Sequence, residues 1–322
     1  MEELSSLESD GENASTDEKA TSDTTKSTVD EDVEEEEIPL EDCDLLMGLW
    51  GWYPEWLQCY RTPQALLFWL CCATFLQGFW FTHYPLVPSS IKTGMVVNGL
   101  VNVIITTIER RFQLHSIESG MVASFYDVGY FTFAFPVSFY GGSRLAQKPQ
   151  WIGIGVLVMG LGSLVFSLPH FLAPSMMSSM SETDTLCHVG GLHGENPCQG
   201  ATETFFSSYK YIFYFGQFLH GVGATPLYTL GVTLLDDTVS SENSPVYLGI
   251  FYAMAVVGPA VGFFIGGESL KQHTELTLKV AELGLSPGSN LWVGAWWIGF
   301  LIASIVAVFV AIPILMFPRK LP

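Results

Sequence analysis

Long runs of apolar residues, separated by short polar segments, dominate the chain after residue 50. Crossing a hydrocarbon layer of ~30 Å takes about 20 helical residues at 1.5 Å per residue. Apart from the first run, which is longer and interrupted, each run has a length suited to one crossing. The predicted spans are Gln64–Ile108, Gly120–Tyr140, Trp151–Leu168, Tyr211–Leu235, Tyr247–Gly267 and Trp292–Phe317. The pattern predicts an all-α polytopic membrane protein.

The last predicted span, Trp292–Phe317, begins and ends with residues that indicate its orientation in the membrane. Three tryptophans stand at its start, no charged residue occurs between Val293 and Phe317, and Arg319 and Lys320 follow. Indole rings favour the headgroup level, and basic residues favour the cytoplasmic edge. These residues predict a helix that enters from outside the cell and ends inside.

The first 50 residues differ in composition from the rest. Of the net charge of −19, about −16 lies before residue 45 and about −3 in the remainder. A segment with so few large apolar residues cannot bury enough surface to order itself. We expect a disordered acidic tail over residues 1–50, followed by a transmembrane half-bundle over residues 51–322.

Basic residues divide equally between the two sides, so they do not set the orientation. Cys187 and Cys198 lie in the longest loop, residues 172–208, and suit a disulfide on the oxidising, extracellular face. The opposite orientation would also carry the acidic tail across the membrane. We therefore expect a multi-pass protein with a cytoplasmic N-terminus.

Ionisable residues inside membrane spans are costly unless they face a partner or a water-filled cavity. Asp127 and His220 stand well inside predicted spans, and each either forms an interhelical hydrogen bond or lines a polar transport path. His170 ends the third span at its outer edge. It is either a plain interfacial histidine or a sensor of external pH, because histidine titrates near neutrality.

Two prolines fall within predicted spans, Pro226 after Thr225 and Pro259 after Gly258. Proline removes a backbone donor and kinks a helix, and broken helices near mid-membrane are typical of secondary transporters. Both positions are therefore candidates for the transport path. The glycines of "GIGVLVMGLGS" and "GVGATPLYTLG" lie in apolar helices without a preceding strand, which favours close helix packing over a dinucleotide loop.

Signatures of enzymes are missing. The chain lacks the P-loop pattern, H-E-x-x-H and G-x-S-x-G, and none of its cysteines has metal-site spacing. A membrane enzyme or receptor is therefore the least favoured interpretation. We expect no catalytic residue, no metal, no cofactor and no nucleic-acid partner.

Several stretches together resemble the organic anion transporting polypeptides, the solute carrier organic anion transporters, and are nearest to the fourth subfamily. "LWVGAWWIGFL" at 291–301 is similar to the family signature, with matching residues Trp292, Gly294, Ala295, Trp296, Trp297 and Gly299. Other similar stretches are "IERRF", "GGSRLAQKPQWIGIG", "LPHF", "GATPLYTLGVTLLDD" and "SPVYLGIFYAMAVVGPAVG". The resemblance runs from about Trp52 to Pro322.

The resemblance implies the amino-terminal six-helix bundle of a twelve-helix major-facilitator fold. It also implies sodium-independent exchange of amphipathic organic anions, such as steroid conjugates, bile salts, thyroid hormones or prostanoids, at the plasma membrane. By position, His170 matches a histidine linked in the family to stimulation by low external pH, and Asp127 matches an acidic position. The signature is expected to place helices rather than to bind the ligand.

The chain departs from the family pattern in three places, and the second and third of these favour an alternative. His220 and Ala224 stand where many relatives carry arginine and glutamate, and residues 79–94 read as an insertion into the first helix. This stretch is either a retained intron or alternative exon, or a tolerated re-entrant bulge. The chain also stops after the sixth span. The alternative is a non-transporting truncated product whose partners, besides the bilayer, are the missing carboxy-terminal half or a full-length paralogue.

Overall fold

The structure, a computed structural model, describes seven segments of the chain: residues 45–49, 52–80, 99–143, 146–174, 208–276, 292–319 and 321. All of them belong to one compact unit, Glu41–Pro322. The expected tail up to residue 44, residues 81–94 of the expected insertion, and the loop that holds Cys187 and Cys198 lie outside the described residues.

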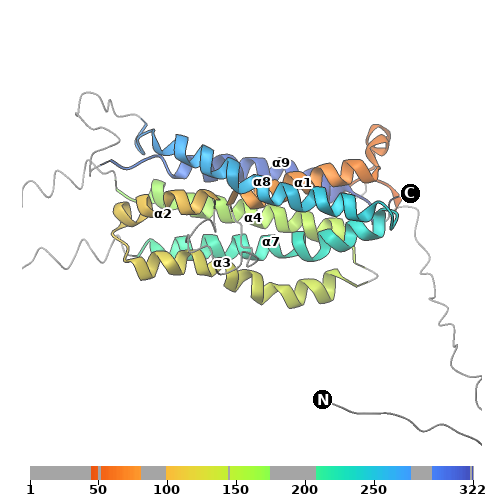
Figure 1. The fold of residues 1–322 in the computed structure, drawn as a ribbon, viewed down its shortest axis with the longest axis horizontal. Helices are drawn as coiled ribbons and strands as arrows, with labels where there is room; N and C mark the ends of the chain where they lie inside the picture. Colours follow the sequence, from red (N-terminus) through yellow and green to blue (C-terminus); the bar gives the residue numbers. More distant parts are fainter. Residues whose placement is uncertain are drawn as a thin grey trace, which may run out of the picture. The chain divides into compact units, whose positions relative to one another are not determined.

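The described residues fold into α-helices (Figure 1). A 3-10 helix, η2, precedes the first long helix, and a single π-helical turn, η3, extends α3. In chain order the helices are η2 (Glu55–Tyr60), α1 (Pro63–Trp80), α2 (Gly99–Phe112), α3 (Ser116–Pro136), η3 (Val137–Gly141), α4 (Lys148–Leu172), α7 (Lys210–Thr238), α8 (Ser244–Leu270) and α9 (Trp297–Met316).

The helices lie where the hydropathy pattern places its spans. Within the described residues, α4, α7, α8 and α9 are long and apolar enough to cross a membrane, and Pro63–Gln77 of α1 is a shorter apolar helix. The predicted first span corresponds to α1 and α2, on either side of residues 81–98. The prediction of an all-α polytopic protein is confirmed.

One boundary differs from the prediction. The last span was expected from Trp292, but α9 begins at Trp297. Residues 292–296 instead run beside the segment that follows α8, with an isolated bridge between His273 and Gly294. Apolar residues of this kind suit a buried extended segment as well as a helix, so hydropathy alone could not separate the two.

Each helix packs on a small set of neighbours. α4 packs most extensively on α7 and α9, α3 packs on α7, and both α1 and α2 pack on α8 (Figure 1). Helices inside a bilayer are already out of water, so the hydrophobic effect does not draw them together. Contacts between them depend on close packing and on hydrogen bonds between helices.

Contacts between helix ends show how the helices are directed. At one end, here called the signature end, Arg111 donates to the carbonyl of Pro174, and Lys210 pairs with Glu118 at 2.6 Å. At the opposite end, the amide of Gly48 donates to the carbonyl of Met316 at 2.9 Å. α1 and α2 both run toward the signature end, as the two parts of the predicted first span, and from α2 onward each long helix runs opposite to the one before it.

Glycines allow the backbones of α4 and α7 to approach each other. A Cβ atom on Gly155 would lie 2.6 Å from the carbonyl oxygen of Gly223, and one on Gly223 would lie 2.5 Å from that of Gly155. The pair Gly162 and Gly216 repeats this arrangement two turns away, at 2.9 and 3.1 Å. These distances leave no room for a side chain, so the packing role expected for these glycines agrees with the structure.

The expected helix breaks at the two prolines are absent. α7 continues through Pro226 and α8 continues through Pro259, and both rings are buried. The carbonyl that loses its donor to Pro226 is that of Val222, and Thr225 Oγ1 donates instead to the neighbouring carbonyl of Gly221 at 2.9 Å. Pro226 also fills the notch at Gly155, which holds its ring in place. Proline is tolerated in membrane helices when neighbours satisfy the freed backbone groups.

We predict opposite effects for two glycine-to-alanine substitutions in adjacent helices. Gly223→Ala should lower the free energy of unfolding by about 1–3 kcal/mol, because the methyl group overpacks the α4–α7 contact. Gly249→Ala, the matched control in α8 with open space around its Cβ position, should raise it by up to about 1 kcal/mol. Unfolding titrations of the purified chain in mixed micelles measure both. Equal effects would contradict the packing role.

Candidate functional site

His220 lies in a fully interior polar network between α4 and α7. Its side chain is 1% exposed. Nε2 lies 2.8 Å from Ser163 Oγ, and Nδ1 lies 3.1 Å from Gln217 Oε1. The structure therefore displays the interhelical hydrogen bond that the sequence left as one option, while a role in the transport path stays a prediction.

The side-chain amide of Gln217 can be oriented in two ways in this network, which differ by exchange of its oxygen and nitrogen atoms. With its oxygen toward His220, the buried Nε2 atom of Gln217 has no hydrogen-bond partner among the residues that the structure describes. Ser163 also donates to the carbonyl of Met159 at 3.2 Å, which makes its oxygen an acceptor for the ring. A flipped amide would then donate to Nδ1 and complete the chain of donors and acceptors.

Aromatic rings and a glycine enclose the imidazole. Phe166 and Phe300 stack on each other with centroids 4.4 Å apart, and each centroid lies 6.4 Å from that of His220. A Cβ atom on Gly162 would lie 2.9 Å from the ring, so glycine makes the space that the imidazole occupies. Three helices, α4, α7 and α9, thus close around one polar side chain.

A second interhelical network joins α1, α3 and α7. Gln77 Nε2 donates to Tyr126 Oη at 3.0 Å, and Tyr228 Oη donates to Gln77 Oε1 at 2.5 Å. The side chain of Gln77 is 3% exposed. The sequence analysis did not predict this network, because it considered only ionisable residues within the spans. The residue that could have indicated it is the uncharged Gln77 in the apolar stretch "TFLQGF".

Asp127 lies apart from both networks. Its side chain is exposed on α3, and in the described part of the chain no hydrogen bond or ion pair holds its carboxylate. The structure does not bring Asp127 into contact with His220, although both are transport-path candidates. Pro226 and Pro259, the other two candidates, are buried in α7 and α8.

The signature residues form a clamp at the signature end. Trp292 Nε1 donates to the carbonyl of Leu270 at 3.0 Å, and the amide of Ala295 donates to that of Gln272 at 2.9 Å. A Cβ atom on Gly294 would lie 2.6 Å from the backbone of Leu270. The residues just before α9, Trp292–Trp296, are therefore tied closely to the end of α8 and the residues that follow it.

The two remaining tryptophans of the signature connect this clamp to the bundle. Trp296 is 1% exposed, and its ring meets those of Phe112 and Phe213 edge-on. Trp297 Nε1 donates to the carbonyl of Thr274 at 3.2 Å. Gly299 in α9 lies against the side chain of Leu100 in α2. These contacts fix helix positions, which is consistent with a structural role.

His170 packs directly on the signature. Its ring stacks on Trp297 with centroids 4.3 Å apart and an interplanar angle of 12°. Nδ1 lies 3.4 Å from Thr274 Oγ1, at the edge of hydrogen-bond range. The ring is half-buried, so a change in its charge would act on the stack with Trp297 and on the segment after α8.

No group of three His, Cys, Asp or Glu side chains in the described residues is arranged to hold a metal ion. Cys59, Cys71 and Cys72 are free thiols.

Apolar helices of membrane-spanning length, packed through glycines around buried polar networks, define a polytopic α-helical membrane protein. The model of the Organic Anion Transporter Polypeptide (OATP) family matches residues 85–322. This match covers most of the chain, and the chain belongs to that family. The resemblance expected from the signature is thus confirmed.

Relatives with curated descriptions agree. The chain is 48% identical over 281 residues to mouse solute carrier organic anion transporter family member 4A1, and 37% identical over 276 residues to mouse member 4C1. Each match covers 85% of this chain and 35% of the relative. Human member 2B1 is 34% identical over 242 residues, which is 71% of this chain and 34% of the relative. The chain spans about a third of the length of these relatives.

The Ser163–His220 contact should contribute a measurable coupling energy. Ser163→Ala leaves a buried ring nitrogen unpaired and should lower the free energy of unfolding by about 1–3 kcal/mol. A double-mutant cycle with His220→Phe should give a coupling of about 0.6–1.7 kcal/mol.

Ser167→Ala is the matched control for this cycle, because Ser167 is equally buried in α4 but donates only to the carbonyl of Leu164 in its own helix. Unfolding titrations of the purified variants supply all the values. The same loss for Ser163→Ala and Ser167→Ala would show that the interhelical bond adds nothing.

Proposed function

We propose that this chain supplies one six-helix bundle, residues 51–322, of a transporter for amphipathic organic anions. The observation that carries the proposal is the match of the OATP family model to residues 85–322. It is supported by relatives whose names describe organic anion transporters. In this proposal the protein lies in the plasma membrane with its N-terminus in the cytoplasm, and it exchanges steroid conjugates, bile salts, thyroid hormones or prostanoids without sodium.

The proposed mechanism is the rocking of two bundles around a site between them. Such motion needs each bundle to move as a unit, and the α4–α7–α9 packing with its enclosed His220 network suits a rigid body. Burial of a sterol-sized body supplies most of the affinity, at ~25 cal/mol per Å² of apolar surface. A few cations on the site then select for negative charge. Asp127, His220, Pro226 and Pro259 are the residues we propose along the path.

A second candidate function is a non-transporting partner of a full-length transporter. It is favoured by the interval between α1, which ends at Trp80, and α2, which begins at Gly99. The predicted first span would be one helix without the residues between them. A single bundle offers one wall of a transport path, so such a product would act by pairing with a full-length relative or with a separate carboxy-terminal half.

An uptake experiment tests the proposed function. The chain, joined in frame to the remaining part of mouse member 4A1, should give saturable, sodium-independent uptake of a labelled steroid sulfate. The chain alone should give background uptake, because alternating access needs two bundles. Intact member 4A1 serves as the positive control.

If the fusion reaches the cell surface without saturable uptake while the control transports the same probe, the proposed function is wrong. Co-expression of the chain alone with intact member 4A1 tests the second candidate. A fall in uptake without a fall in the surface level of member 4A1 would support it, and unchanged uptake would remove it.

In the same fusion, His170→Gln should flatten the dependence of uptake on external pH. A protonated imidazole over Trp297 gains about 0.5–2 kcal/mol of cation–π attraction, which glutamine cannot supply. The ratio of uptake at acidic to neutral external pH should therefore fall to about one in the variant, in line with the lost charge. His115→Gln is the control, since His115 is exposed at the same end of the bundle. An unchanged ratio in His170→Gln would make His170 purely structural.

A further inference from the structure

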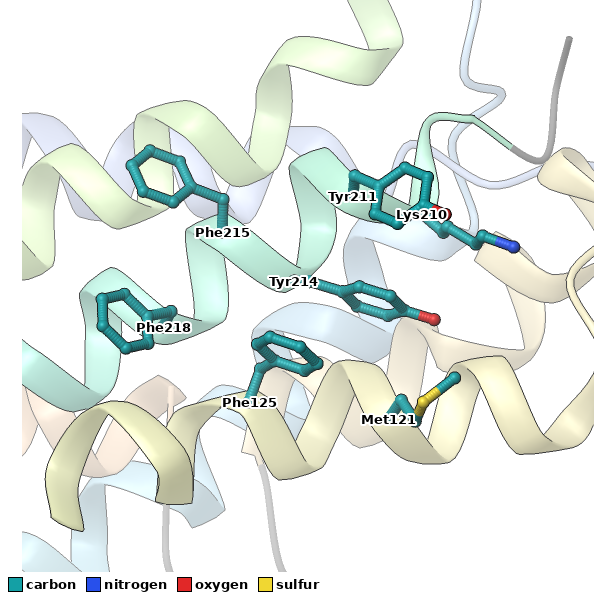
Figure 2. Close-up of a pocket in the computed structure, with 7 residues that line it drawn as sticks. All are labelled: Met121, Phe125, Lys210, Tyr211, Tyr214, Phe215 and Phe218. Carbon is teal, nitrogen blue, oxygen red and sulfur yellow. The ribbon is translucent and has the colours of Figure 1, made fainter. Parts of the chain in front are cut away.

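A groove of about 440 Å³ lies between α3 and α7 near the signature end. Its volume is within the range of about 300–1,000 Å³ typical of small-molecule sites. Figure 2 shows the side chains around it, with Lys210 at one end. The apolar lining consists of Met121, Phe125, Tyr211, Tyr214, Phe215 and Phe218.

Aromatic rings make up most of the lining of the groove. Phe125 of α3 and Tyr214 of α7 stack with centroids 4.7 Å apart and an interplanar angle of 5°. Tyr211 and Phe215 stand around them with 64% and 54% of their surfaces exposed. A flat apolar body laid on these rings would gain both burial and ring contact, which suits a fused-ring skeleton better than a flexible chain.

A cation closes one end of this apolar surface. Lys210 Nζ lies 2.6 Å from Glu118 Oε1 and 5.5 Å from the ring centroid of Tyr211. The side chains of Lys210 and Glu118 are only 20% and 15% exposed. An ammonium group has three donors, so Lys210 can hold Glu118 and still donate to an oxygen of a bound anion. Glu118 repels the same anion.

This partly buried ion pair separates the groove from an ordinary lipid-facing surface. Elsewhere on α3 the exposed face carries apolar side chains such as Val128, Phe131 and Phe135. Glu118 and Lys210 lie in the first turns of α3 and α7, so their ion pair sets charged groups at the end of the groove that is nearest the helix termini. The combination of aromatic walls with a cation at one end matches a ligand with an apolar body and an anionic end.

We propose that this groove binds an amphipathic organic anion that has a flat apolar body and one sulfate or carboxylate group. The anionic group takes hydrogen bonds from Lys210, and the ring system lies against the exposed rings of Tyr211 and Phe215, beside the stacked pair Phe125 and Tyr214. The inference rests on the proposed function for its ligand class. It assigns that ligand to a surface that a single bundle carries, so binding to it requires no transport.

Binding to the purified chain in nanodiscs of zwitterionic lipid tests this proposal. The probes are a steroid sulfate and the same steroid without its sulfate. Lys210→Gln should raise the Kd of the sulfate by about tenfold, through loss of a hydrogen bond to a charged group. Glu118→Gln should lower it by about threefold, because it removes a repelling charge. The Kd of the neutral steroid should stay within about twofold in both variants.

A second ion pair at the same end of the bundle provides the matched controls. Lys271 pairs with Glu268 at 2.6 Å outside the groove. Lys271→Gln and Glu268→Gln should change the Kd of the sulfate by less than about twofold, as expected for an exposed charge that the ligand does not touch.

The opposite signs at Lys210 and Glu118 make the test decisive. Losses of affinity in both variants would mean that the pair is structural, and this would overturn the proposal. An equal effect of Lys271→Gln would do the same. Competition by anionic lipid added to the nanodisc would assign the groove to a lipid headgroup instead.

A protection measurement decides the matter if the Lys210 variant fails to fold. The rate of thiol modification of Met121→Cys, corrected for the chain without this substitution, should fall at least threefold when the steroid sulfate saturates the chain. An unchanged rate would overturn the proposal. If the steroid sulfate binds with this charge dependence but the fusion shows no uptake, the proposed binding site is supported and the proposed function is wrong. If the fusion shows uptake but the purified chain shows no such binding, only the proposed binding site is wrong.

Discussion

The close approach of α4 to α7 is the contact on which the rest of the bundle depends. In hydrocarbon no hydrophobic force draws helices together, so packing and interhelical hydrogen bonds must hold them. Facing glycines, Gly155 with Gly223 and Gly162 with Gly216, bring the two backbones within reach of each other. That approach places Ser163 2.8 Å from the buried imidazole of His220. Any side chain at these glycines would separate the helices and break the hydrogen bond with the same movement.

The signature residues extend this rigid core to one end of the bundle. α9 packs on α4, and the turn before α9 carries Trp296 into a cluster of rings from α2, α4 and α7. The residues before it hold the end of α8 through backbone hydrogen bonds at Val293 and Ala295. A histidine stacked on Trp297 therefore sits on the part of the bundle where α4, α8 and α9 meet. A family signature made of glycine and tryptophan is explained by this geometry: glycine allows contact with backbone, and tryptophan fills space and supplies a donor.

The sequence predicts most of the helices because a spanning segment must satisfy its own backbone groups, and only a long apolar helix does so. It fails where local composition does not decide the conformation. Trp292 lies before α9 rather than inside it, and α7 continues through Pro226, whose ring fills the space that Gly155 leaves. The network around Gln77 was missed because an uncharged amide carries no strong signal among apolar residues. The groove could not be read from the sequence at all, since its walls depend on the relative rotation of α3 and α7.

α7 carries the contact with α4 on one face and the wall of the groove with α3 on the opposite face. Gly216, His220 and Gly223 face α4, whereas Lys210, Tyr214 and Phe218 follow one another at four-residue spacing along the groove with α3. Residues three and four apart share a face of a helix, so these two sets cannot exchange neighbours without rotating α7 as a whole. Such a rotation would pull His220 away from Ser163 and force the glycines out of contact. A ligand in the groove would therefore contact a helix whose opposite face is held by α4. Any motion that the ligand favours must move α3, α4, α7 and α9 together.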